Sequence, residues 1–328
     1  MLGRSIEYWP GLALAALLVS APVMAEAASE QVLVKRDIVY GQGLIDADSQ
    51  PRERDLLMDW YQPAAVSDEP RPAVIMAFGG SFLRGSKGDE HFHENGSQDS
   101  SMAEYCLAFA RRGYNCFSIE YRLMQENPAL AEAIPVDKLM PENLAITPQT
   151  TARIDFARQA QGLEPMDDKL RAQFWQALLS ASEDMASAVA HVRSQSDKYS
   201  VDPERIAIGG FSAGAITAIN AAYGRQLPVK AVLSMSGSTW GYLLPGHVGN
   251  SAPPLLQFVG QEDLPGVVRG SAAVAAALDD VGVERQMAWV PGFGHFYPMG
   301  AVSLAADFSK LSVEQRAVEF LQRQLMTQ

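Results

Sequence analysis

The stretch Ile206-Ala207-Ile208-Gly209-Gly210-Phe211-Ser212-Ala213-Gly214 decides the fold of this 328-residue chain. Its apolar first half predicts a buried strand, Arg205–Gly209, and the small residues after Ser212 predict a helix, Ala213–Tyr223. G-x-S-x-G between a strand and a helix is typical of a serine raised on a tight turn. The helix N-terminus behind the turn favours negative charge. Ser212 is therefore the candidate nucleophile, and an ordinary glycine-rich turn is the alternative.

Nearly continuous apolar strands alternate with helices along the rest of the chain. We expect strands at Gln31–Tyr40, Leu56–Tyr61, Pro72–Phe78, Tyr114–Glu120, Val229–Met235, Leu255–Val259 and Glu284–Val290, and helices at Ser101–Arg112 and Val313–Met326. This alternation is typical of a mostly parallel sheet that is buried on both faces. The predicted fold class is therefore α/β, with a mostly parallel central sheet and helices on both faces.

The segment 124–179 interrupts the alternation. Its first half contains four prolines, and its second half places Leu170, Phe174 and Leu178 at helical spacing. We expect an inserted helical lid, or cap, over one edge of the sheet, with a structural buttress as the alternative.

The N-terminus predicts export. Residues 1–25 combine Arg4, an apolar run from Leu12 to Val19 that is too short to span a bilayer, and small residues up to Ala25. We therefore expect a cleaved signal peptide, one mature domain at 26–328 and a periplasmic or secreted protein without stable membrane insertion. An uncleaved anchor is the alternative.

Composition excludes several classes of protein. With 48% hydrophobic and 20% charged residues, the chain is neither disordered nor a polytopic membrane protein. It has 38 acidic and 26 basic side chains, a net charge of −12, and no basic block. Because nucleic-acid binding depends on Lys and Arg neutralising phosphates, we expect no nucleic-acid partner.

A serine hydroxyl needs a base, and the base needs a carboxylate that orients it. His295 follows the last predicted core strand in a glycine-flanked loop, and Asp263 follows the strand Leu255–Val259, with Glu262 as its rival. The carboxyl ends of parallel strands meet at one edge of the sheet. The order Ser212, Asp263, His295 is the order found on α/β-hydrolase sheets.

A second glycine-containing turn, Phe78-Gly79-Gly80-Ser81-Phe82, follows the strand Pro72–Phe78. Backbone N–H groups of Gly80, Ser81 and Ala213 are the predicted oxyanion hole. An ordinary turn is the alternative.

Two further patterns, a pair of histidines and a pair of cysteines, are outside the predicted catalytic residues. His91 and His93 form an H-x-H pair, but no third ligand at suitable spacing joins them, so a solvated loop is expected there and no metal. The serine mechanism requires no organic cofactor either. Cys106 and Cys116 lie on a predicted helix and the strand that follows it. The spacing leaves a disulfide and two buried thiols equally open, since sequence does not supply the Cβ geometry.

Together these motifs resemble the α/β-hydrolase superfamily, in particular its bacterial carboxylesterase and lipase branch of hormone-sensitive-lipase-like and feruloyl or acetyl esterases. The resembling segments are Leu57–Pro63 (L-x-D-x-Y-x-P), Arg112–Tyr114 (R-G-Y), Glu120–Leu123 (D-Y-R-L, with Glu for Asp), Asp202–Ile206 (D-P-x-R-I), Gly260–Asp263 (G-x-x-D) and Gly294-His295. The sequence departs from the family at Phe78, where the oxyanion loop usually has His. That departure means that the side-chain anchoring of the loop is lost or replaced.

The resemblance implies an exported serine carboxylic-ester hydrolase that acts on small-molecule esters through an acyl-enzyme. A serine peptidase of the prolyl-oligopeptidase type and a non-catalytic binding module on the same fold are the alternatives. We expect four aromatic side chains to line the substrate pocket, with buried packing as the alternative for the last two: Phe82, Phe211, Trp240 and Tyr242. The oligomeric state and the acyl and alcohol specificity do not follow from the sequence.

Overall fold

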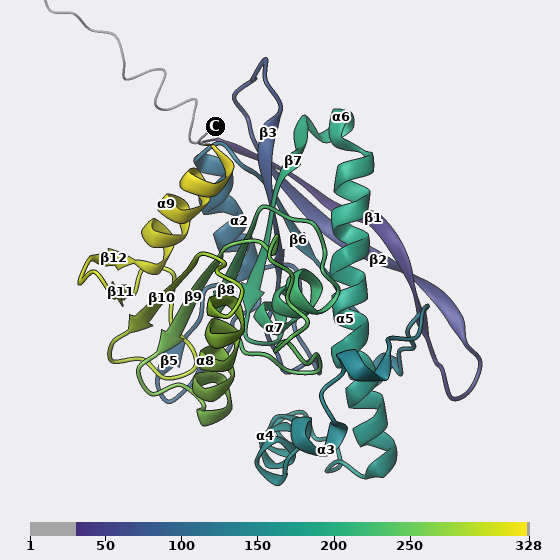
Figure 1. Ribbon diagram of the computed structural model, residues 1–328. Helices are drawn as coiled ribbons and strands as arrows, with labels where there is room; N and C mark the ends of the chain where they lie inside the picture. Colours follow the sequence, from purple (N-terminus) through teal and green to yellow (C-terminus); the bar gives the residue numbers. More distant parts are fainter. Residues whose placement is uncertain (1–30, 327–328) are drawn as a thin grey trace, which may run out of the picture.

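The computed structural model describes residues 31–326, so the predicted signal peptide at 1–25 lies outside the described residues (Figure 1). A ten-stranded sheet has the order β1-β2-β6-β3-β7-β8-β9-β10-β11-β12, with β6 to β10 parallel and the outer pairs antiparallel. Its strands are β1 (Val32–Ile45), β2 (Arg52–Pro63), β3 (Arg71–Ala77), β6 (Asn115–Ile119), β7 (Val201–Phe211), β8 (Ala231–Met235), β9 (Leu255–Gly260), β10 (Arg285–Val290), β11 (Val302–Ala305) and β12 (Lys310–Ser312). A separate small hairpin pairs β4 (His93–Glu94) with β5 (Ser97–Gln98).

Helices cover both faces of the sheet (Figure 1). On one face α2 packs against α9, and on the other α5 packs against α7. The helical segments are α2 (Met102–Arg111), η1 (Met124–Glu126), η2 (Val136–Lys138), α3 (Glu142–Ala145), α4 (Pro148–Gln159), α5 (Asp168–Ser194), α6 (Ser196–Tyr199), α7 (Ala213–Ile219), η3 (Asn220–Gly224), α8 (Pro265–Asp279) and α9 (Val313–Leu325). The predicted α/β class with a mostly parallel sheet is confirmed. No helix within residues 31–326 is both long and apolar enough to cross a bilayer.

The centre of the sheet is formed by β3 and β7, which are buried on both faces. Ala73 through Ala77 have no exposed surface, as their unbroken apolar sequence requires. The register pairs Ala77 with Gly210 and places Met235 of β8 beside Phe211. The carboxyl ends of β3, β7 and β8 therefore meet at one edge of the sheet, where the chain turns at Ser212.

The inserted segment 124–179 holds η1, η2, α3, α4 and the start of α5. It is attached to the loop after β8, since Met140 N–H donates to Gly241 O and Trp240 Nε1–H donates to Ala145 O, both at 2.9 Å. A bidentate ion pair also joins Arg153 of α4 to Glu94 of β4, at 2.5 and 2.8 Å. The segment is thus fastened at two places outside its own helices.

A buried arginine connects the sheet to this insertion. Arg122, with a side chain only 1% exposed, donates from Nε to Asp184 of α5 at 3.0 Å and from a terminal nitrogen to Glu183 at 2.7 Å. Its other terminal nitrogen donates to Leu44 O of β1 and to Ala129 O of the insertion. The guanidinium faces two carboxylates and each of its three nitrogens has an acceptor, as a buried cation requires.

Candidate active site

Ser212 occupies the sharp turn between β7 and α7. Its backbone has φ 52° and ψ −114°, a conformation that non-glycine residues rarely adopt and that is held here by the surrounding strands. The turn needs glycine at its flanks: a Cβ on Gly214 would lie 2.0 Å from Ala77 O, and one on Gly210 would lie 2.4 Å from the same oxygen. The side chain of Ser212 stays partly exposed at the edge of the sheet.

His295 lies in the loop after β10 and faces Ser212. Its Nε2 is 2.8 Å from Ser212 Oγ. The ring is 7% exposed and packs edge-on against Phe211 and Phe296. These contacts fix the plane of the imidazole ring, and its Nε2 faces the hydroxyl of Ser212.

Asp263 lies just after β9 and holds the other ring nitrogen. Its Oδ1 is 2.7 Å from His295 Nδ1 and also accepts the N–H of Leu264 at 2.7 Å. Glu262, the rival from the sequence, is exposed and does not reach the imidazole. The structure therefore brings together Ser212, His295 and Asp263, three residues from the ends of three strands.

Two residues at this site were missed by the sequence analysis. The Ser236 hydroxyl donates to Asp263 Oδ2 at 2.6 Å, and the Tyr297 hydroxyl lies 3.2 Å from Ser236 Oγ while donating to Phe258 O. With the N–H of Gly260 at 3.3 Å, the buried carboxylate has donors on both oxygens. The sequence held a signal for Ser236, because it directly follows the predicted strand Val229–Met235, whose carboxyl end lies at the same sheet edge.

The predicted oxyanion loop lies directly beside Ser212. A Cβ on Gly79 would be 3.4 Å from Ser212 Cβ, so the loop backbone and the serine are neighbours. Gly80 has φ 111°, and a Cβ there would lie 1.9 Å from Arg84 O, so only glycine fits. Within residues 31–326, the backbone N–H groups of Gly80, Ser81 and Ala213 have no hydrogen-bond partner. They are available to a bound oxygen.

Three of the four predicted pocket aromatics are packing residues. Phe211, Phe82 and Tyr242 are at most 1% exposed, and only Trp240 keeps exposed surface. Phe82, Trp240 and Phe174 of α5 form an aromatic cluster with ring centres 5.1 to 6.1 Å apart. Phe82 is thus covered by α5 and Trp240, whereas Phe211 packs against Phe296 and Tyr297.

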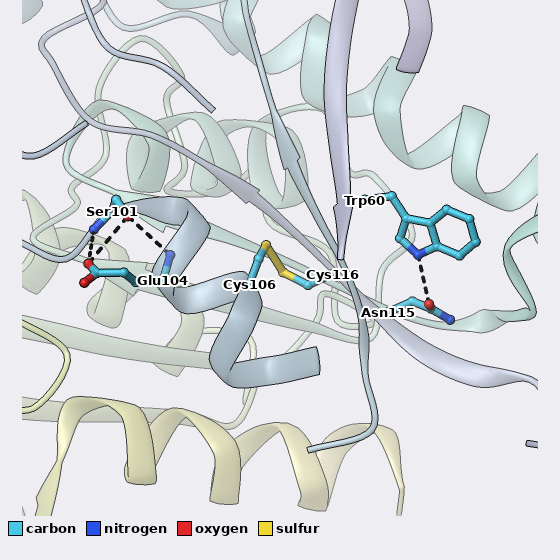
Figure 2. The surroundings of a disulfide bond; sticks show 6 residues. All are labelled: Trp60, Ser101, Glu104, Cys106, Asn115 and Cys116. Carbon is cyan, nitrogen blue, oxygen red and sulfur yellow. Dashed lines mark hydrogen bonds between the residues drawn. A yellow bond between two sulfur atoms is a disulfide. The ribbon is translucent and has the colours of Figure 1, made fainter. Parts of the chain in front are cut away.

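A disulfide joins Cys106 of α2 to Cys116 of β6 (Figure 2). It resolves the alternative that the sequence left open. Within residues 31–326 there is no group of three or more His, Cys, Asp or Glu side chains able to hold a metal ion. His91 and His93 instead contact the Asp99 carbonyl and the Gln98 side chain of their own loop.

A cavity of about 370 Å³ lies between this loop and the loop that carries His295. Asp99, Ser97 and Glu104 line one side, and Phe293 and Pro298 line the other. Burial raises the pKa of the Asp99 carboxyl from 3.8 to about 6, although the N–H of Phe92 and nearby histidines oppose the rise. A larger cavity, about 670 Å³, lies between α5 and residues 127–139 of the insertion.

Comparison with known proteins gives a family match over the region that carries Ser212, Asp263 and His295. The sequence profile of the phospholipase/carboxylesterase family matches residues 176–312. A search among curated proteins finds no match.

Solved structures with similar folds include esterases. Thermogutta terrifontis esterase 2, in a form phosphorylated by paraoxon, is 17% identical, with 89% of this chain and 92% of that chain covered and a TM-score of 0.52. MGS-M1, an α/β-hydrolase enzyme from a Medee basin deep-sea metagenome library, is 14% identical, with 91% and 100% covered and a TM-score of 0.55. The solved structures thus show that the chain has the α/β-hydrolase fold, and residues 176–312 are similar to the phospholipase/carboxylesterase family.

Proposed function

We propose that the chain is an exported serine hydrolase that cleaves carboxylic esters through an acyl-enzyme formed on Ser212. The observation that carries the proposal is the continuous hydrogen-bond chain from Ser212 Oγ through His295 to Asp263, at 2.8 and 2.7 Å. A serine, an imidazole and a carboxylate in this order are the components of nucleophilic acyl transfer.

In the first half of the reaction, Ser212 Oγ attacks the ester carbonyl while His295 Nε2 takes the hydroxyl proton. Asp263 keeps the Nδ1 proton facing the carboxylate, so Nε2 is the basic nitrogen, and it stabilises the imidazolium that forms. The C–O bond to the alcohol then breaks, and the imidazolium donates its proton to the leaving oxygen. The acid remains bound as an ester of Ser212.

The charge that develops on the carbonyl oxygen is held by backbone N–H groups of Ala213, Gly80 and Ser81. Each such donor typically contributes roughly 10²–10³ in rate. In the second half, His295 activates a water that attacks the acyl-enzyme, and the carboxylic acid leaves. These steps need no group from outside the chain other than the ester and water.

The inserted segment 124–179 and the net charge of the chain both affect which esters the enzyme prefers as substrates. Trp240 keeps exposed surface and is held by Ala145 of the insertion, so we propose that the 124–179 segment acts as a lid that shapes the acyl side of the site. The net charge of −12 favours neutral or cationic esters over polyanionic ones.

The proposal of export depends on residues 1–25. The Cys106–Cys116 disulfide supports it, because structural disulfides persist mainly in oxidising compartments. Expression of the full chain with fractionation and N-terminal sequencing tests it. Mature protein that begins just after Ala25 outside the cytoplasm is the expected result, and uncleaved protein retained in the cytoplasm contradicts export.

The test of the activity is the Ser212→Ala variant against p-nitrophenyl esters from acetyl to lauroyl, with feruloyl and acetylated-sugar esters and peptide anilides alongside. We expect kcat/KM for the best ester to fall by roughly 10⁴-fold or more, together with loss of labelling by a fluorophosphonate probe. Ser118→Ala, which removes another buried serine hydroxyl in β6, is the matched control and retains activity. Ester turnover that survives Ser212→Ala, or parent enzyme that cleaves anilides and not esters, overturns the proposal.

A further inference from the structure

The backbone conformation of the loop Phe78–Gly85 requires stabilising contacts from residues outside the loop. Gly80, Ser81 and Phe82 all have positive φ, which costs free energy at the two non-glycine residues and persists only where neighbours hold the backbone. The side chain at 78 is Phe, which has no polar group to hold the loop. The anchor therefore has to come from another segment.

Tyr121, two residues after β6, contacts the loop with both its ring and its hydroxyl. The ring stacks on Phe78 with centres 4.4 Å apart and planes 21° apart. The hydroxyl donates to Phe78 O at 2.8 Å, with Gly79 O at 3.4 Å as a second acceptor. Tyr121 is 1% exposed, and burial raises the pKa of its hydroxyl well above the usual value, so it remains a donor across the working pH range.

The segment that follows Tyr121 continues this support. Met124 N–H donates to Phe82 O at 2.9 Å, and the Gln125 side-chain amide donates to Leu83 O. Residues 121–125 therefore contact the oxyanion loop at its beginning, through Tyr121, and at its middle, through Met124 and Gln125.

The direction of these bonds matters for the oxyanion hole. In a trans peptide the C=O of one residue and the N–H of the next lie in one plane and point in opposite directions, and residues 31–326 contain no cis peptide. A hydroxyl that holds the carbonyls of Phe78 and Gly79 therefore directs the N–H groups of Gly79 and Gly80 away from Tyr121. Gly79 itself adjoins the nucleophile, since a Cβ there would lie 3.4 Å from Ser212 Cβ.

We propose that Tyr121 is a positioning residue for the oxyanion hole: its hydroxyl sets the orientation of the Phe78–Gly80 peptides and thereby of the Gly80 N–H. This inference rests on the proposed function, since it assigns Tyr121 a part in stabilising the tetrahedral intermediate. Tyr121 touches no reacting atom and acts through the loop backbone alone.

The test is Tyr121→Phe, which keeps the stacked ring and removes only the hydroxyl. Tyr114→Phe is the matched control, because Tyr114 is equally buried and its hydroxyl has no partner within residues 31–326. Three quantities are measured for each variant: kcat and KM per titrated active site, the rate of fluorophosphonate labelling, and the inhibition constant of a trifluoromethyl ketone, which forms a tetrahedral adduct with the serine. Circular dichroism and the melting temperature report folding.

We expect Tyr121→Phe to lower kcat by about 10- to 100-fold with KM nearly unchanged, as for a weakened oxyanion contact. Ketone affinity and labelling rate fall in parallel, and Tyr114→Phe matches the parent. Unchanged kcat, a rise confined to KM, or an equal loss in Tyr114→Phe overturns the inference. If the parent is labelled but cleaves no ester, the proposed function fails, whereas slower labelling of Tyr121→Phe still supports the inference. A parent that neither labels nor turns over ester overturns both.

Discussion

The Ser236 hydroxyl donates a 2.6 Å hydrogen bond to Oδ2 of Asp263, the carboxylate oxygen that faces away from His295. Ser236 adopts φ 50°, so the strand end of β8 is bent to bring the hydroxyl to the carboxylate. The carboxylate is thereby held from both sides and cannot rotate away from the imidazole.

Ser236→Ala and Ser236→Gly both remove this donor, and glycine also accepts the positive φ without strain. We expect each to lower kcat roughly tenfold, because a hydrogen bond to a charged acceptor is worth about 1.5–3 kcal/mol and only part of it acts on the reaction. The downfield proton resonance of the His295–Asp263 hydrogen bond, measured by NMR, should shift in both variants.

Ser234→Ala is the control for these variants. Ser234 is buried on β8, the strand that Ser236 follows, and its hydroxyl has no partner in the part of the chain that the structure describes. A Ser236→Gly enzyme with parental kcat and an unmoved proton resonance would show that the Ser236 hydroxyl does not position Asp263.

The ion pair between Arg153 and Glu94 predicts a local change in the insertion. Both side chains are partly exposed, so the pair contributes about 0.2–1 kcal/mol. Glu94→Gln should therefore raise hydrogen–deuterium exchange in α4 by about two- to fivefold, with little effect on the global melting temperature. Asp279→Asn breaks a surface pair with Arg285 away from the insertion and should leave α4 exchange unchanged. Equal exchange in the parent and Glu94→Gln would mean that the pair does not fasten α4.

The disulfide predicts a redox-dependent stability. Cys106 and Cys116 close a short loop, for which the expected stabilisation is about 2–3 kcal/mol. Denaturant unfolding of the parent with and without dithiothreitol should show this difference in the free energy of unfolding. The double variant Cys106→Ala/Cys116→Ala should be insensitive to the reductant, and a parent equally insensitive would contradict the prediction.

The Asp99 carboxyl predicts how stability depends on pH. Burial raises the pKa of Asp99 from 3.8 in the unfolded chain to about 6 in the folded protein. Between pH 3.8 and about pH 6, the folded protein therefore binds a proton at Asp99 that the unfolded chain does not. The contribution of Asp99 to the free energy of unfolding is therefore most favourable at low pH and declines as pH rises through about 6. Asp99→Asn should stabilise the protein by about 1–3 kcal/mol at pH 7.5 and by much less at pH 4.

Urea unfolding at the two pH values checks this prediction. Asp89→Asn, an exposed carboxyl nearby in the sequence, is the control and should have little effect at either pH. A loss of stability in Asp99→Asn at pH 7.5 would contradict the assigned cause.

The parallel core of the fold and the three site residues could be predicted because their signals are local. The strand β7, the glycines around Ser212 and the loops that carry Asp263 and His295 each follow from a short run of residues. The edge strands β11 and β12, of four and three residues, are too short to show a period-2 pattern. The helix α5 runs from Asp168 to Ser194, so the predicted boundary of the insertion at about residue 179 falls inside one continuous helix.

The pocket residues could not be predicted, because burial of a side chain depends on distant segments. Phe82 loses its exposure to Phe174 and Trp240, which come from a helix and a loop far along the chain. The anchoring of the oxyanion loop by Tyr121 likewise depends on how β6 lies beside β3. The motif at Glu120–Leu123 was visible, but its contact with Phe78 was not.

The buried guanidinium of Arg122 limits how this enzyme can be redesigned. It bonds to the insertion at Ala129 and to α5 at Asp184, so it belongs to the insertion as much as to the sheet. Exchanging residues 124–179 for a shorter connection would remove the Ala129 carbonyl, one acceptor of this buried guanidinium, and a buried donor left without an acceptor typically costs about 1–3 kcal/mol. A chimera would therefore need another carbonyl or hydroxyl oxygen in the place of Ala129 O.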